Sequence, residues 1–87
     1  MAEDNYKRII DTFLANEIDV NKFIDQFMNQ WRKDRDENVK NDNRFQRLID
    51  RIFTSCDCYN EKPEKHFEID ENKLKQEVEL LRHIWFG

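Results

Sequence analysis

The side chains with the most reactive chemistry in this 87-residue chain are two cysteines and two histidines. Cys56 and Cys58 are separated by a single residue, and His66 and His83 follow them. Structural zinc sites usually use a cysteine pair separated by about two to four residues, with a matching second pair of ligands. Neither feature is present, so we expect no metal site and interpret Cys56 as a small apolar residue on a helix.

Nucleophilic catalysis would need Ser55 or Cys58 beside a histidine that is itself oriented by a third group. The chain contains one glycine, so it lacks the glycine-rich turns that position nucleophiles, phosphates and oxyanions in enzymes. We therefore expect a protein that is not an enzyme, with no cofactor and no small-molecule substrate. A small enzyme or metal-binding domain is kept as an alternative, which metal analysis of the purified protein would test.

The acidic residues are unevenly distributed. Six acids and two lysines lie from Asp57 to Glu71, so this stretch carries −4, equal to the net charge of the whole chain. Tyr59 and Phe67 lie within the same stretch. Aromatic side chains supply contact area at protein interfaces, and charges steer the encounter between partners. The stretch is therefore either a solvated loop or an electronegative binding surface.

A net charge of −4 argues against a general nucleic-acid-binding protein, which needs a surplus of lysine and arginine. The charge suits a basic protein partner instead. No stretch approaches the roughly 18 apolar residues that span a membrane. Residues 1–5 lack the basic flank and apolar run of a signal peptide. We therefore expect a cytoplasmic protein that does not contact a membrane.

Four amphipathic helices would position these residues, because apolar side chains recur at spacings of three and four in four segments. One glycine and one proline are too few for the frequent turns of a sheet protein. We expect an all-α protein, a small antiparallel four-helix bundle formed by a single domain over residues 1–87. The predicted core faces are Tyr6, Ile9, Ile10, Phe13 and Leu14; Val20, Phe23, Ile24, Phe27, Met28 and Trp31; Phe45, Leu48, Ile49, Ile52, Phe53 and Cys56; and Leu74, Val78, Leu81, Ile84 and Trp85.

Short polar residues before each segment predict where the helices begin, because their side chains can accept the free amide hydrogens of the first turn. The predicted N-caps are Asp4 or Asn5, Asp19, Asn41 or Asp42, and Asp70. Between Arg32 and Arg44 only Val39 is apolar. We therefore expect the second helix to continue through Arg35 without a buried face, with a connection near residues 36–41.

The order of several short motifs resembles that of a known family. These motifs are Phe13–Ile18, Phe23–Ile24, Trp31–Arg32, Ile52–Tyr59 and Ile69–Leu74. With these residues the chain resembles the colicin D immunity protein family, which includes many immunity proteins of contact-dependent growth inhibition systems. The resemblance covers nearly the whole chain, and the segment containing Asp57 and Tyr59 contributes most to it.

The resemblance implies a four-helix bundle that stays in the toxin-producing cell and binds the C-terminal nuclease domain of a cognate toxin. Such toxins typically cleave transfer RNA, and the family inhibits by occluding the active-site cleft with acidic groups in place of substrate phosphates. A cleft that grips RNA must be cationic, so an acidic loop is its physical complement. The predicted toxin-binding residues are Asp57, Tyr59, Glu61, Glu64, Phe67, Glu68 and Glu71.

An acidic helical adaptor or transcriptional co-regulator that binds another protein is the alternative function. Genomic position would separate the two hypotheses, because an immunity gene lies directly downstream of a large toxin gene.

Overall fold

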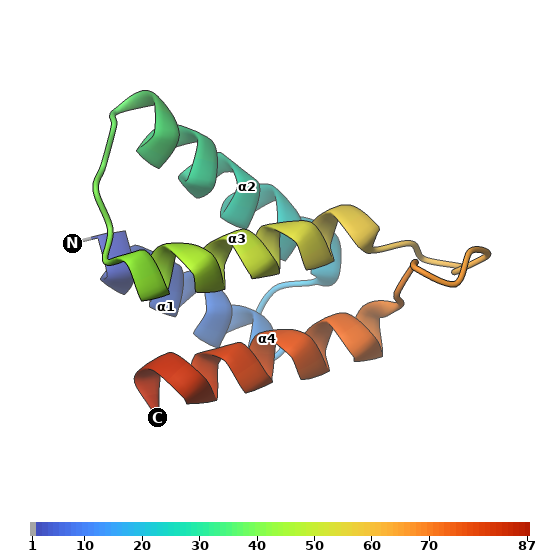
Figure 1. The fold of residues 1–87 in the computed structure, drawn as a ribbon. Coiled ribbons are helices and arrows are strands. Elements are labelled where there is room, and N and C mark those ends of the chain that lie inside the picture. The colour runs from blue at the N-terminus through green and yellow to red at the C-terminus, as the bar shows by residue number, and fades with distance from the viewer. Residues whose placement is uncertain (1) are drawn as a thin grey trace.

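The computed structural model describes residues 2–87 and contains four helices joined by three connections. The helices are α1 (Ala2–Leu14), α2 (Val20–Asp36), α3 (Asn43–Cys58) and α4 (Glu71–Phe86). Successive helices run in opposite directions, so the end of α4 lies at the same end of the bundle as the start of α1 (Figure 1). No strand is present among the described residues, and the predicted all-α four-helix bundle is confirmed.

Aromatic side chains join all four helices in one core. The rings of Phe13 and Phe23 stack at 4.1 Å between α1 and α2. The fully buried ring of Tyr6 lies 5.8 Å from that of Phe45 on α3, which in turn lies 5.3 Å from Trp85 on α4. Such pairs contribute about 0.5–1.5 kcal/mol each beyond their burial. The four amphipathic faces therefore meet in one interdigitated cluster.

Three of the four predicted helix starts are confirmed by their capping hydrogen bonds. Asp19 accepts the Lys22 amide hydrogen at 2.7 Å, Asp42 accepts that of Arg44 at 2.8 Å, and Asp70 accepts that of Lys73 at 2.9 Å. The prediction for the first helix was wrong, because α1 begins at Ala2 and contains both Asp4 and Asn5. The longer helix places Glu3 in the first turn, where its carboxylate accepts a hydrogen bond from the Trp85 indole.

Asparagine lies just after α1 and just after α2, at the position where glycine commonly ends a helix. Asn16 and Asn38 adopt positive φ angles of 61° and 53°, in the left-handed region. Around Asn38, its own amide donates to the Arg35 carbonyl and the Val39 amide donates to the Asp34 carbonyl, which is the Schellman pattern. Asparagine tolerates this backbone conformation better than most residues, so the chain can end two helices with almost no glycine.

Two predictions about the core were wrong. Ile84 is 64% exposed, because Trp85 and Phe86 at the end of α4 both pack against Phe45 and leave Ile84 facing solvent. The α2 helix does not lose its buried face after Trp31, because Asp34 is only 7% exposed. The side chain of Gln30 donates to Asp34 Oδ1 at 2.9 Å. No periodic apolar residue marks this position, which is why the pattern missed it.

Candidate interaction surface

The connection between α3 and α4 is closed at its base. The Asn60 amide donates to the Ile69 carbonyl at 2.9 Å, and the Ile69 amide donates to the Cys58 carbonyl at 3.0 Å. These bonds form an isolated parallel bridge between Tyr59 and Ile69. The chain between them, residues 60–68, projects beyond the end of the bundle (Figure 1). We call residues 59–70 the acidic loop.

Glu68 holds the acidic loop together from within. Its carboxylate accepts hydrogen bonds from the Asn60 side chain at 2.7 Å and from the amides of Lys65 and Glu64 at 2.9 and 3.2 Å. These hydrogen bonds lower the pKa of Glu68 below its usual value. Both oxygens of Glu68 are therefore engaged inside the loop, unlike those of a carboxylate free to meet a partner.

Tyr59 lies at the centre of a negative region. Its side chain is half-buried and packs against the core from the end of α3. Burial raises the pKa of its hydroxyl, and the carboxylates of Glu61, Glu71, Asp19 and Asp70 raise it further. Asp19 was not among the predicted interface residues, because its position suggested only a helix cap. It joins the acidic end because α2 begins at the end of the bundle where α3 stops.

The structure places all seven predicted interface residues at this end of the molecule. Asp57 is exposed in the last turn of α3, and Glu71 is exposed as the first residue of α4. Glu61 and Glu64 are exposed in the loop, and within residues 2–87 their carboxylates bond to no other side chain. Phe67 is 56% exposed, with the Lys65 ammonium 5.7 Å from its ring centre. Glu61, Glu64 and Phe67 are therefore free to meet a partner.

The cysteines differ in their surroundings. Cys56 is buried on the core face of α3, and this burial, with the neighbouring charge of Asp57, raises its pKa to about 12. Cys58 is half-buried, and both thiols are free. Over residues 2–87, no three His, Cys, Asp or Glu side chains are grouped so as to hold a metal ion. Over the same residues, no helix has both the length and the apolarity to cross a membrane.

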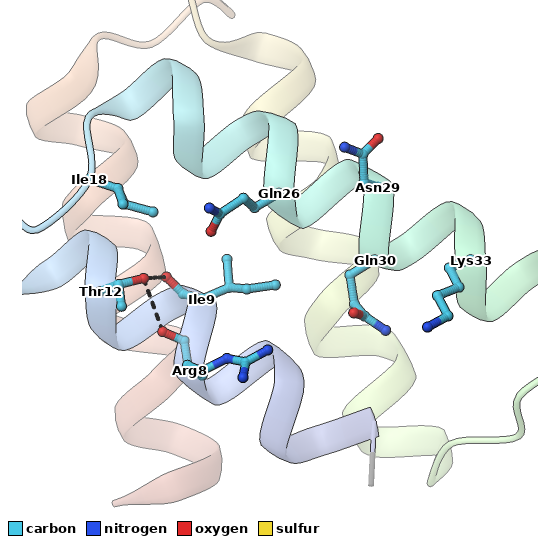
Figure 2. A pocket seen from close by; sticks show the side chains of 8 residues that line it. All are labelled: Arg8, Ile9, Thr12, Ile18, Gln26, Asn29, Gln30 and Lys33. Carbon is cyan, nitrogen blue, oxygen red and sulfur yellow. Dashed lines mark hydrogen bonds between the residues drawn. The ribbon is translucent and has the colours of Figure 1, made fainter.

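A groove of about 510 Å³ lies between α1 and α2. Figure 2 shows the side chains that line it, which on α2 are those of Gln26, Asn29, Gln30 and Lys33. Arg8, Ile9 and Thr12 of α1 and Ile18 of the connection complete the lining. Sequence reasoning did not find this groove, because its polar residues follow the outer edges of two helices and resemble any solvated surface.

Comparison with known proteins gives one family. Residues 1–83 match the model of a family described as bacterial self-protective colicin-like immunity. The match extends through the first three helices, the acidic loop and most of α4. No curated protein and no solved structure matches the chain at the significance we required.

Proposed function

Because the chain belongs to the family of bacterial self-protective colicin-like immunity proteins, we propose that it neutralises a cognate toxin nuclease by covering the active site. The partner is a protein, and the chain acts on it as an inhibitor rather than as an enzyme. In the finer form of this proposal the toxin is of the colicin D or contact-dependent type, cleaves transfer RNA, and is met by this protein in the cytoplasm.

The observation that carries the proposal is the concentration of carboxylates around Tyr59. Glu61, Glu71, Asp19 and Asp70 act together on its hydroxyl, although they come from two separate parts of the chain. A nuclease cleft that binds RNA must present cations to the phosphates. Carboxylates on a projecting loop can occupy the positions of those phosphates, and an exposed aromatic ring such as Phe67 supplies apolar contact.

The test is charge reversal at Glu61 and Glu64, whose carboxylates are exposed and bond to no other side chain within residues 2–87. We expect Glu61→Lys with Glu64→Lys to weaken toxin binding strongly, with slower and less salt-sensitive association, because charges of this kind act through steering. The thermal stability should not change. The measurement is surface plasmon resonance with the toxin domain encoded next to this gene, followed by a growth-protection assay.

The choice of control and test positions follows from the contacts. Glu68 and Asp70 are unsuitable for the test, because one closes the loop and the other caps α4. Glu3 and Asp11 are unsuitable as controls, because Glu3 bonds to Trp85 and Asp11 bonds to Arg82. Asp25→Lys with Glu79→Lys, on exposed helix faces, is the matched control. If this pair loses as much affinity as the test pair, or the test pair loses none, the acidic loop is not the toxin-binding surface.

A further inference from the structure

The α2 side of the groove is a continuous polar stripe. Gln26, Asn29, Gln30 and Lys33 are separated by three, one and three residues, so they share one face of the helix. In Figure 2 the side chains of Gln26, Gln30 and Lys33 point from α2 toward α1, whereas that of Asn29 points away from α1. The floor is apolar, because Ile9 is 7% exposed and the half-buried Ile18 packs against the core. The groove therefore combines polar walls with an apolar base.

The charge of the groove is the opposite of the charge of the whole chain. No carboxylate lines it, whereas the exposed cations Arg8 and Lys33 both do. Neither cation forms an ion pair within residues 2–87. Asp11, which lies with Arg8 on the adjoining surface, is already bonded to Lys7 and Arg82. The two groove cations are therefore available to an anionic partner.

Hydrogen bonds within the protein orient two of the polar side chains. The Gln30 amide nitrogen donates to the buried Asp34, and the Thr12 hydroxyl donates to the carbonyls of Arg8 and Ile9. Donors to a partner must then come mainly from Arg8, Lys33 and the free amides of Gln26 and Asn29. The ligand that fits this set is an acidic segment that also carries one apolar side chain for the floor.

This chain itself exposes such a segment, and we propose that the acidic loop of one copy docks in the groove of a second copy. Glu61 and Glu64 are the partners for Arg8 and Lys33, and the exposed ring of Phe67 covers the apolar floor. The loop projects away from its own helices, so the contact is between copies (Figure 1).

Loop and groove are different surfaces. If two copies each place their loop in the other's groove, they form a closed twofold pair; if each copy engages a further copy instead, they form a ring or an open chain. A loop of this length covers a small area, which makes the complex weak and transient. The contact does not depend on toxin binding. If the same loop also binds a toxin, however, the two interactions are mutually exclusive, and the toxin disperses the self-associated protein.

Sedimentation of the full chain at micromolar to millimolar concentration and low salt tests the proposal. The protein should associate with itself, and added salt should weaken this association. Arg8→Glu with Lys33→Glu (the groove variant) and Glu61→Lys with Glu64→Lys (the loop variant) should each associate at least about tenfold more weakly, because each replaces attraction with repulsion. Arg47→Glu with Arg51→Glu, on exposed positions of α3, is the matched control and should behave as the unaltered chain.

Mixing the two variants gives the decisive result. The loop variant retains an intact groove and the groove variant retains an intact loop, so the mixture should form a mixed complex although each variant alone associates at least about tenfold more weakly than the unaltered chain. Circular dichroism of each variant is the check that it keeps its helices. A chain that stays monomeric at every concentration would overturn the proposal. So would association that the groove variant leaves unchanged, or a mixture that remains monomeric.

Discussion

At the residue scale, Asp11 and Glu68 are both partly exposed carboxylates, but they accept hydrogen bonds from different kinds of donor. Asp11 accepts hydrogen bonds from Arg82 of α4 and from Lys7 of its own helix. Burial opposes the ionisation of Asp11, but these two hydrogen bonds outweigh it and lower its pKa. Glu68 is mostly surrounded by amide donors of its own loop instead. The first carboxylate therefore joins two helices, and the second shapes a loop.

Both lowered pKa values predict that acid destabilises the protein. A carboxylate with a lowered pKa in the folded state adds stability at pH values above its unfolded pKa, which is 3.8 for Asp11 and 4.5 for Glu68. This contribution is lost as the pH falls through the lower folded values. We expect the urea concentration at the denaturation midpoint to decrease as the pH is lowered below about 5. Asp11→Asn should lower the midpoint at pH 7 and flatten its fall in acid.

The control for this measurement is Asp25→Asn, an exposed acid of α2 to which no side chain bonds within residues 2–87. It should reproduce the slope of the unaltered chain. An equal slope in the Asp11→Asn variant would show that its bonds to Arg82 and Lys7 do not couple protonation to folding.

The two thiols are expected to react at different rates. Burial and Asp57 hold the pKa of Cys56 near 12, so it carries almost no thiolate at neutral pH, while Cys58 is partly accessible. Alkylation of the native protein followed by mass spectrometry should modify Cys58 first, and Cys56 only after denaturant is added. Equal labelling of both residues in the native state would mean that Cys56 is not part of the core. Cys58→Ser should leave toxin neutralisation intact.

At the element scale, one residue type recurs where helices begin and another recurs where they end. Aspartate caps the starts of α2, α3 and α4, and asparagine in the left-handed conformation ends α1 and α2. The link of residues 15–19 thus contains both Asn16, which ends α1, and Asp19, which caps the start of α2. Short connections of this kind hold consecutive helices antiparallel. They also place the start of α2 beside the end of α3, which brings Asp19 to the acidic end.

Asn38 offers a test of the helix ending without disturbing other contacts. Asn38→Ala should lower the free energy of unfolding by about 1 kcal/mol, because alanine is strained in the left-handed conformation. Asn38→Gly should cost nothing or add stability, because glycine adopts this conformation without strain. Urea denaturation of the two variants gives the comparison. If alanine and glycine prove equivalent, the positive φ of residue 38 does not contribute to stability.

At the scale of the whole molecule, the aromatic cluster unites the four helices. Phe27 is fully buried, with its ring 5.3 Å from Tyr6 and 5.8 Å from Phe23. Tyr6 in turn contacts Phe45, which contacts Trp85 and Phe86 on α4. Truncating one ring removes contacts between several helices at once, so we expect the whole bundle to unfold cooperatively.

Phe27→Ala should lower the free energy of unfolding by about 3–5 kcal/mol. This is a large part of the roughly 5–15 kcal/mol that stabilises a domain. Ile84→Ala, at a 64% exposed position, is the control and should change the stability by less than about 0.5 kcal/mol. Chemical denaturation followed by circular dichroism measures both. A small effect at Phe27, or a large one at Ile84, would mean that the core is differently arranged.

The sequence by itself determined the features that depend on residues near one another in the chain. The aspartate caps act within the first turn of a helix, and the spacing of apolar residues follows the helical repeat, so Asp19, Asp42, Asp70 and nearly all core positions could be predicted. The charge of −4 on residues 57–71, which include the acidic loop, is also local, since it depends on the residues of that stretch alone.

Tertiary structure decided what depends on distant partners. Ile84 shares the pattern of a core residue but is exposed, because Trp85 and Phe86 fill the space against Phe45. Asp34 is 7% exposed and its side chain lies near Tyr6 of α1; burial raises the pKa of Tyr6, and Asp34 raises it further. The groove exists only where α1 and α2 pack side by side. The carboxylate of Asp19 acts on the Tyr59 hydroxyl only because α2 begins at the end of the bundle where α3 stops. Periodicity assigns a residue to a helix face, whereas packing decides what that face meets.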